Sequence, residues 1–194
     1  TSSSCLPAVP GVPAPTAFIG VFKAYCTSVG AGPFPTEIEG QFAERIREKG
    51  GEYGTTTGRP RRIGWFDAVA ARYAAEVAGF TSIVVTKMDV LDGFDEVRIC
   101  TAYEAGGKAT TRMLLTDGLL HARPIYETLP GWKHWKTKEG MRFLERIEEL
   151  TQVRLGAVGF GPDRGQIWEK PPELVFGARW KPVFEELSFE QQPI

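Results

Sequence analysis

The sequence has few of the residues that build disulfide frameworks and metal sites, with three cysteines and two histidines among 194 residues. Cys5, Cys26 and Cys100 are odd in number and follow no spacing typical of zinc ligands. We therefore expect neither a disulfide scaffold nor a zinc site, and a reducing compartment suits the chain.

Long hydrophobic runs and a charge imbalance are also missing. No apolar run approaches the ~18 residues that a membrane-spanning helix needs, and the opening residues, TSSSCLPAVPG, lack the basic and apolar regions of a signal peptide. The formal net charge of -1 gives no overall attraction to nucleic acid or anionic lipid. These absences predict a cytoplasmic protein that binds no membrane and no nucleic acid, and in which a local basic cluster holds any anion.

The pattern along the chain predicts an α/β protein. Short apolar or alternating runs, typical of strands, occupy residues 18–26, 81–86, 96–104 and 153–160. Amphipathic patterns typical of helices occupy residues 39–49, 66–80 and about 137–150. A helix that leads into a short apolar strand is typical of a mainly parallel sheet with flanking helices, whose ligands bind beyond the carboxyl ends of the strands.

Other segments lack a clear period. Residues 1–16 and 105–135 are predicted to be mostly loop, and residues 170–194 to form an extended tail. In the helix at 66–80, Asp67 lies in the first turn. The apolar stripe of this helix is expected to comprise Phe66, Val69, Ala70, Tyr73, Ala74 and Val77.

The segment TKMD, residues 86–89, follows the predicted strand at 81–86. A carboxylate at Asp89 can accept hydrogen bonds from the N1 and N2 groups of guanine, while the stem of Lys87 covers the base. Adenine lacks the N2 donor, so it would leave this carboxylate unpaired, and such a mismatch discriminates strongly. The alternative is that Lys87 and Asp89 are ordinary solvated charges at a strand end.

The segment GTTTGRPRRIGW, residues 54–65, combines the features of an anion site. Glycine-flanked turns present backbone N–H groups, threonines offer hydroxyl donors, and arginines grip a carboxylate or phosphate at two points. Pro60 fixes the backbone between Arg59 and Arg61, so the neighbouring guanidinium groups should reach different partners. A basic surface hairpin or a nucleic-acid patch is the alternative, but acidic neighbours favour a small-molecule site.

The segment GFGPDRG, residues 159–165, ends the last predicted strand with small residues. Such residues let a backbone approach a flat ligand closely. A tight turn without a ligand explains the same residues equally well.

Taken in order, several segments together resemble adenylosuccinate synthetase: KAYCTSVGAGPFPTE, GEYGTTTGRPRRIGW, TSIVVTKMDVLDGFDEVRICTAYE, PIYETLPGW, RIEEL and GFGPDRG. The opening TSSS is similar to the T-S-S loop of that family. The resemblance covers roughly residues 1–167, so residues 1–169 are expected to be the carboxyl-terminal part of a P-loop NTPase-like synthetase domain and residues 170–194 a tail without counterpart.

The resemblance implies a reaction and a set of binding residues. The family joins IMP to L-aspartate with GTP and Mg²⁺, as a homodimer: the 6-oxygen of IMP is phosphorylated and the aspartate amine displaces that phosphate. It implies an aspartate loop at Thr55, Thr56, Thr57, Gly58, Arg59, Pro60 and Arg61. It implies IMP contacts at Thr1, Val29 and Arg59. It implies GTP contacts at Arg61, Lys87, Met88, Asp89, Gly159, Phe160 and Gly161.

The family's amino-terminal half is absent from this sequence. That half carries the G-D-E-G-K-G-K phosphate loop, whose aspartate is the catalytic base and a magnesium ligand, and a histidine that acts as general acid. No G-x-x-x-x-G-K occurs here, and neither His121 nor His134 lies in a matching motif. We therefore assign no catalytic residue and no metal ligand, place the Mg²⁺ ligands in the absent half, and expect the chain alone to be inactive.

Three interpretations remain open. In the first, the chain is part of a synthetase, either a piece of a longer enzyme or one half of a split enzyme. In the second, it is a non-catalytic module that binds guanine nucleotides or purines. In the third, it is a variant ligase. Ser28, where the family usually has arginine, keeps the variant open. A self-contained binding module should have protected sheet edges, whereas a part of a synthetase should expose an apolar sheet edge.

Overall fold

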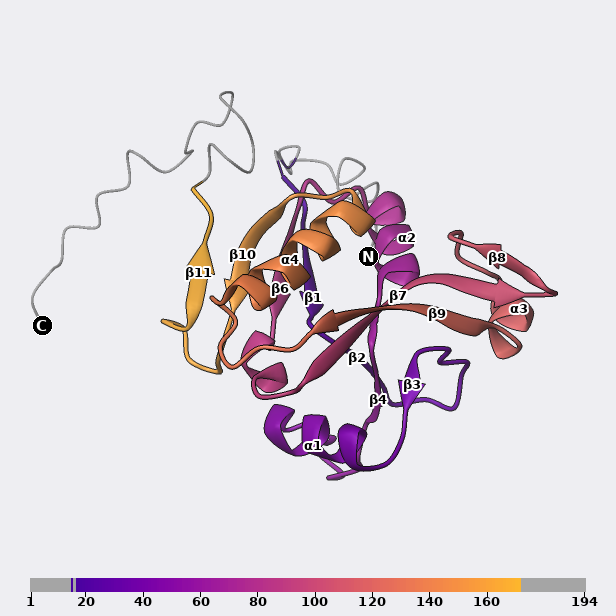
Figure 1. The fold of residues 1–194 in the computed structure, drawn as a ribbon, viewed down its shortest axis with the longest axis horizontal. Coiled ribbons are helices and arrows are strands. Elements are labelled where there is room, and N and C mark those ends of the chain that lie inside the picture. The colour runs from indigo at the N-terminus through magenta and orange to yellow at the C-terminus, as the bar shows by residue number, and fades with distance from the viewer. Residues whose placement is uncertain (1–14, 16, 172–194) are drawn as a thin grey trace, which may run out of the picture.

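The computed structural model describes residue 15 and residues 17–171, which form three small sheets and four α-helices (Figure 1). The first sheet has the order β1 (Ile19–Lys23), β6 (Ser82–Thr86), β10 (Leu155–Gly159) and β11 (Ile167–Glu169). Strands β1, β6 and β10 are parallel, and β11 runs antiparallel to β10. The carboxyl ends of the three parallel strands therefore lie at one edge.

The other two sheets are mixed or antiparallel. β2 (Cys26–Ser28), β4 (Arg62–Gly64) and β3 (Glu37–Ile38) form an antiparallel sheet. In the third sheet β7 (Glu96–Ala105) is parallel to β5 (Phe66–Asp67) and antiparallel to β8 (Lys108–Thr110) and β9 (Arg123–Pro130). The predicted α/β class is confirmed, but the strand pairing is mixed rather than mainly parallel.

The long pairing of β9 with β7 is the main reason for that difference. Residues 123–130 belong to the segment that the sequence analysis predicts as loop, yet they alternate between exposed and half-buried positions along most of β9. An alternating strand beside an antiparallel neighbour buries one face and leaves the other in water. The sequence RPIYETLP itself does not alternate, and its two prolines and the following Gly131 are typical of a loop, so the strand was concealed.

The helices begin and end where local chemistry dictates. α1 (Gln41–Gly50) ends at Gly51, whose φ of 60° is left-handed and favours glycine. α2 (Ala68–Ala78) begins after Asp67, whose side chain accepts a hydrogen bond from the backbone N–H of Ala70. α4 (Lys138–Thr151) begins after Thr137, which caps Gly140 in the same way, and α3 (Thr116–Leu120) is a short helix between β8 and β9.

The main core brings together the first sheet, helices α1, α2 and α4, and strand β7. Ile83 and Val85 of β6 and the α4 residues Phe143, Leu144 and Ile147 are almost fully buried. The buried face of α4 also includes Gly140 and Thr151.

The predicted apolar stripe of α2 is wrong in part. Val69 is buried as expected, but Ala68, Ala71 and Ala75 form the rest of the buried face. Tyr73 and Val77 are 49% and 55% exposed. Alanines on the inner face let α2 pack closely on α4 and β7, so the larger apolar residues are left outside.

One edge of the first sheet is apolar and exposed. β1 is the edge strand of its sheet among the described residues, and its Ile19 and Val21 side chains are 55% and 67% exposed. Phe22, on the opposite face of β1, packs edge-on against Phe66 and Phe80. Parallel sheets are normally covered on both faces, and their edges are normally paired or protected. The exposed apolar side chains of the edge strand β1 are therefore typical of a surface that other polypeptide covers.

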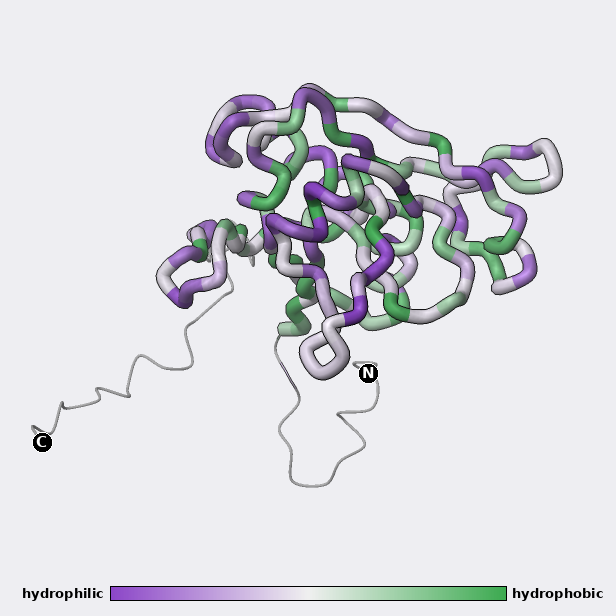
Figure 2. Tube along the Cα trace, turned by 90° about the horizontal axis from the view of Figure 1, so that it is seen from below, coloured by the Kyte–Doolittle hydropathy of each residue, from purple (hydrophilic) through white to green (hydrophobic). Residues whose placement is uncertain are grey.

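Hydrophobic stretches along the trace are short and are interrupted by hydrophilic ones (Figure 2). Within the part of the chain that the structure describes, no helix is long and apolar enough to cross a membrane.

Candidate functional site

Two of the predicted motifs meet at the carboxyl edge of the first sheet. Val85 of β6 pairs with Val158 of β10, which places Thr86 beside Gly159. A Cβ on Gly159 would lie 3.2 Å from Cγ2 of Thr86, so glycine permits this close approach. TKMD and GFGPDRG are about 70 residues apart in the sequence, and the parallel pairing makes their starts neighbours.

The backbone at TKMD turns sharply after β6. Lys87 has a φ of 64°, a left-handed conformation that is uncommon for lysine, and a 3₁₀ turn, Met88–Leu91, follows. The Met88 side chain is fully buried in the core, so only its main chain can face a ligand. The amino group of Lys87 donates to the Gly50 carbonyl at 2.8 Å.

Asp89 carries a buried oxygen without a partner. Its Oδ1 atom is inaccessible to solvent and accepts no hydrogen bond from any described residue. A buried polar atom left in this state costs about 1–3 kcal/mol, and a donor that reached this oxygen would remove that cost. Lys49 donates to the main-chain carbonyls of Asp89 at 3.3 Å and Asp92 at 2.8 Å, and so fixes the backbone of the turn on α1.

Asp92 also has a buried, unpartnered Oδ1 among the described residues. Burial raises the pKa of this carboxyl, although nearby Trp132, His134 and Lys49 act in the opposite direction. Its backbone bridges to Trp132, and the adjacent Gly93 N–H donates to the Trp132 carbonyl at 2.7 Å. Asp92 therefore belongs to the same turn, although the sequence analysis gave it no role.

The loop at residues 55–61 projects from the fold as a hairpin. Tyr53 and Pro60 form an isolated antiparallel bridge, and Gly54 N–H donates to the Arg59 carbonyl at 2.8 Å. The residues from Thr55 to Pro60 are exposed. The guanidinium of Arg59 makes no hydrogen bond or ion pair with the described residues, so it is available to a ligand.

The next two arginines point to different partners. Arg61 Nη1 donates to Glu52 Oε2 at 2.7 Å, whereas Arg62 Nε donates to Glu37 Oε1 at 2.8 Å. Arg62 Nη1 also donates to the carbonyls of Gly30 and Gly32, both at 2.8 Å, and so shapes the loop that carries Val29, which is 67% exposed. Because Arg59 has no partner among the described residues, the expectation that the guanidinium groups of Arg59 and Arg61 reach different partners stays a prediction.

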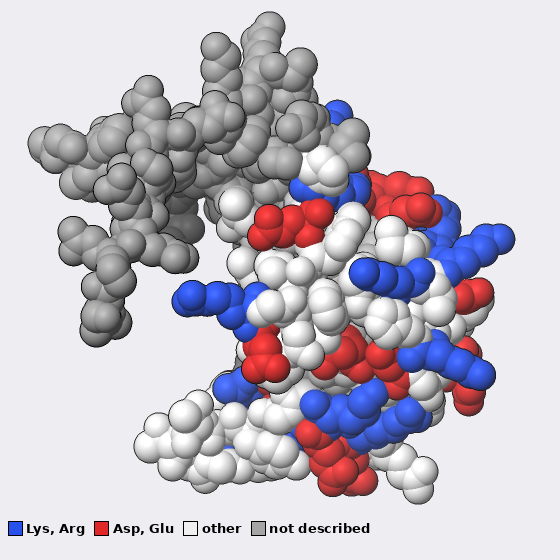
Figure 3. All heavy atoms as spheres, turned by 90° about the vertical axis from the view of Figure 1, so that its left-hand side faces the viewer, with Lys and Arg blue, Asp and Glu red and all other residues white. Residues whose placement is uncertain are grey.

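A cleft of about 340 Å³ lies at the base of this loop. Its charged lining mixes arginine with glutamate: Arg47, Arg61, Arg62, Glu37, Glu39 and Glu44. Basic and acidic side chains are likewise interspersed on the face drawn in Figure 3, with no broad basic surface there. This mixture suits a small ligand better than a nucleic-acid backbone.

Glu52 connects the loop to the first sheet. The residue is 1% exposed, and its carboxylate accepts hydrogen bonds from Lys23, Tyr25 and Arg61. Burial alone would raise the pKa of Glu52, but these hydrogen bonds outweigh burial and the pKa is lowered. The quoted motifs contain Lys23, Tyr25 and Glu52. No sequence pattern predicted that these three side chains are in contact.

The residues at 159–161 lie in a compact turn. The Phe160 ring stacks on Trp135, with ring centroids 5.3 Å apart, and a Cβ on Gly161 would overlap the Gln166 side chain. Gln166 Oε1 in turn accepts from the Asp163 N–H at 2.9 Å. Both the turn and the ligand interpretations of this segment fit that geometry. Thr1 lies outside the described residues.

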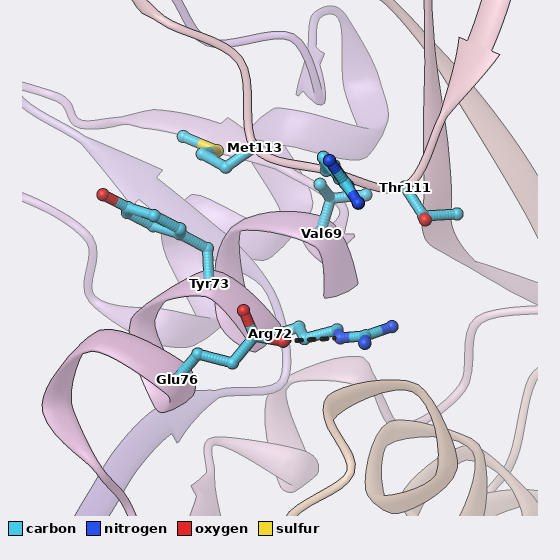
Figure 4. A pocket seen from close by; sticks show the side chains of 7 residues that line it. Val69, Arg72, Tyr73, Glu76, Thr111 and Met113 are labelled. Atoms are coloured by element: carbon cyan, nitrogen blue, oxygen red, sulfur yellow. Dashed lines mark hydrogen bonds and ion pairs between the residues drawn. The ribbon is translucent and has the colours of Figure 1, made fainter.

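A larger cleft, of about 670 Å³, lies away from these motifs, between α2 and residues 111–113 (Figure 4). Tyr73, Arg72 and Glu76 project into it from α2, and Arg72 pairs with Glu76 at 2.9 Å. No motif of the sequence predicts a ligand for these residues. Among the described residues, no group of three or more His, Cys, Asp and Glu side chains is placed to hold a metal ion.

Comparison with known proteins places this geometry in a family. The adenylosuccinate synthetase family model matches residues 1–168. Among curated relatives, the adenylosuccinate synthetase of Saccharopolyspora erythraea is 48% identical over 160 residues, 76% of this chain and 37% of the relative. That of Aquifex aeolicus is 47% identical over 164 residues, 79% of this chain and 38% of the relative.

Solved structures agree with the sequence comparison. The fully ligated adenylosuccinate synthetase from Plasmodium falciparum has a TM-score of 0.77 and 31% identity, covering 80% of this chain and 40% of that one. A second solved structure, the cyanophage S-2L succinoaminodeoxyadenylate synthetase, is 19% identical with a TM-score of 0.50. The match covers 90% of this chain and 40% of the cyanophage chain, and it shows likeness of fold alone. The chain thus spans somewhat over a third of the length of these relatives, and it belongs to the adenylosuccinate synthetase family.

Proposed function

We propose that this chain supplies the aspartate loop and the guanine-binding edge of an enzyme that ligates IMP and L-aspartate with GTP. The observation that carries the proposal is the buried, unpartnered Oδ1 of Asp89, at the carboxyl end of β6 and inside a motif of the family. The N1 and N2 groups of guanine supply donors of the kind this atom lacks. The P-loop NTPase-like fold of the complete domain and its homodimeric state remain predictions from the resemblance.

The loop at residues 55–61 would hold the carboxylates and phosphates. Arg59 is exposed and has no partner among the described residues, and the hydroxyls of Thr56 and Thr57 lie on the same exposed turn. Guanidinium groups bind carboxylates and phosphates at two points, which fixes both position and orientation. In this proposal Arg59 serves aspartate and IMP, and Arg61 reaches GTP from the base of the loop.

The chain's own residues would bind and orient, and would perform no proton or phosphoryl transfer. The described residues offer no site for Mg²⁺, so the metal and the groups that act on the phosphates would come from the part of the relatives that this chain does not span. Localisation in the cytoplasm is likewise a proposal that rests on the family.

The exposed edge of β1 favours a part of a synthetase over a self-contained purine-binding module. Ile19 and Val21 are more than half exposed on a parallel sheet. Covering such a surface with further chain would bury apolar area at about 25 cal/mol per Å². A stand-alone module is disfavoured because it would have to tolerate this edge in water.

A hybrid enzyme tests the proposal. Residues 1–168 replace the corresponding segment of the Saccharopolyspora erythraea synthetase, and adenylosuccinate formation is measured by mass spectrometry with IMP, aspartate and GTP. We expect product that depends on all three substrates and decreases when Arg59 is replaced by leucine. A hybrid that folds, by circular dichroism and cooperative melting, but makes no adenylosuccinate would refute the proposal.

Two measurements separate the remaining alternatives. The intact mass of the polypeptide from its natural source distinguishes one half of a split enzyme, at 21.4 kDa, from a segment of a longer chain. Replacing IMP by other purine nucleotides in the hybrid tests the variant ligase, because Ser28 replaces a charged side chain near the predicted IMP contact at Val29. Equal or better use of another purine would favour the variant.

A further inference from the structure

Four side chains form a hydrogen-bonded cluster beneath the 55–61 loop: Glu52, Lys23, Tyr25 and Arg61. Lys23 Nζ donates to both carboxylate oxygens of Glu52, at 2.8 and 2.9 Å. The Tyr25 hydroxyl and Arg61 Nη1 each donate to the same carboxylate at 2.7 Å. The Glu52 side chain is 1% exposed, whereas those of Lys23 and Arg61 are each 29% exposed. The cluster is therefore buried at its carboxylate and open at its cations.

The Glu52 cluster has an excess positive charge, and its two cations differ in how many of their donors are hydrogen-bonded. Burial and the neighbouring Glu52 both raise the pKa of the Tyr25 hydroxyl, so Tyr25 is neutral. One carboxylate and two cations therefore give the cluster a net charge of +1. Lys23 Nζ donates to both carboxylate oxygens of Glu52 and to Thr27 Oγ1, the last at 3.1 Å, so its three donors are used. Arg61 engages Nη1 alone among the described residues, so its Nε and Nη2 donors are open. The excess positive charge is thus presented by Arg61.

We propose that Glu52 is a positioning residue that holds the Arg61 guanidinium ready for an anionic phosphate ligand, while Lys23 offsets the charge of Glu52. Identifying that ligand as GTP rests on the proposed function. The backbone supports the same arrangement, because Arg61 N–H donates to the Glu52 carbonyl at 3.0 Å and Arg47 Nε donates to the Arg61 carbonyl at 3.0 Å. An arginine held before binding loses less rotamer freedom when the ligand arrives.

The cluster also reaches the guanine-binding edge. Gly50, which precedes the Glu52 segment, packs against Tyr25 and accepts a hydrogen bond from Lys87 Nζ at 2.8 Å. Tyr25 thus lies between the aspartate loop and the turn that follows β6. The Gly50 carbonyl therefore joins Lys87 to the segment that carries Glu52.

Substituting Glu52 with glutamine separates positioning from simple charge, because the two effects have opposite signs. If Glu52 acted only as a nearby negative charge, its removal would strengthen the binding of a phosphate anion. If it positions Arg61, its removal should weaken GTP binding by about 10- to 30-fold, the change that corresponds to the rotamer freedom of one arginine. Glu52→Asp, which keeps the charge and shortens the side chain, should also weaken binding.

The measurement is equilibrium binding of GTP by calorimetry to the hybrid synthetase described above. Glu127→Gln is the matched control, because Glu127 pairs with Arg146 at 2.7 Å on β9 and α4, away from the loop. We expect weaker GTP binding for both Glu52 variants, a raised KM for GTP with a smaller change in kcat, and no change for the control. Unchanged or tighter GTP binding in Glu52→Gln would overturn the proposal.

A second measurement keeps the proposal testable if the hybrid fails to bind GTP, an outcome that would count against the proposed function. Nitrogen-15 spectra of the 194-residue chain report the mobility of arginine side chains directly. We expect the Nη signals of Arg61 to be separate and slowly exchanging in the original chain and averaged in Glu52→Gln. Identical Arg61 signals in both chains would overturn the positioning role.

Discussion

Replacing Asp67 by alanine should be among the most damaging single changes to the stability of this chain. The side chain is 6% exposed and serves two elements at once. Its Oδ1 accepts from the Ala70 N–H at 3.0 Å and caps α2, while its Oδ2 accepts from the Tyr103 hydroxyl of β7 at 2.6 Å. The change to alanine removes both acceptors and leaves the hydroxyl of Tyr103, a residue that is 1% exposed, without this partner.

The magnitude follows from these two losses. An N-cap contributes about 1 kcal/mol, and a buried group left unsatisfied costs about 1–3 kcal/mol. We therefore expect Asp67→Ala to lower the free energy of unfolding by about 2–4 kcal/mol. Asp67→Asn keeps an N-cap oxygen and should cost less, about 1 kcal/mol. Tyr103→Phe should remove part of the same interaction.

Urea unfolding followed by tryptophan fluorescence measures these differences, and the double variant Asp67→Ala with Tyr103→Phe closes a cycle. Because the residues are hydrogen-bonded, the double variant should cost less than the sum of the single variants. Additive costs, or an Asp67→Ala chain within about 0.5 kcal/mol of the original, would refute the reasoning.

Burial raises the pKa of Asp67, although its hydrogen bonds act the other way, so the folded state holds this proton more tightly than the unfolded state. The contribution of Asp67 to stability should therefore fall as the pH rises through its folded pKa, and Asp67→Asn should remove that fall. The pKa of Glu52 is lowered, so its contribution is present above its unfolded pKa and is lost as the pH falls through the folded value. Unfolding titrations of Asp67→Asn and Glu52→Gln should show opposite changes of slope in acid, and parallel profiles would contradict this. Asp89→Asn should weaken GTP binding to the hybrid and shift its preference towards nucleotides other than GTP, whereas unchanged affinity would remove Asp89 from the site. Arg59→Leu should cost about 1.5–3 kcal/mol in ligand binding if it makes charge-assisted hydrogen bonds, and an unaltered aspartate dependence would leave the loop a structural feature. Gly131→Ala should unfold the chain around the PGW segment, because its Cβ would overlap the Phe94 carbonyl, and a melting temperature equal to that of the original chain would contradict this.

Local signals in the sequence sufficed for the three longer helices and for strands β1, β6, β7 and β10. The helices at 41–50, 68–78 and 138–151 lie close to the predicted ranges, since caps such as Asp67 and terminal glycines such as Gly79 act within a few residues of chain. The stripe of α2 was misplaced because hydrophobicity favours Tyr73 and Val77, whereas close packing favours the smaller alanines. Strand β9 was missed because its stability comes from the ladder with β7, a partner about 27 residues away.

By itself, the sequence determined the family and the order of the motifs, because these are written in short contiguous segments. The tertiary structure alone decided which of those residues share a site. It placed Thr86 beside Gly159, left the buried oxygen of Asp89 unpaired, and gathered Lys23, Tyr25 and Arg61 on Glu52. Hydrogen bonds act over about 3 Å, so contacts between residues distant in the chain exist only once strand pairing and packing have brought them together.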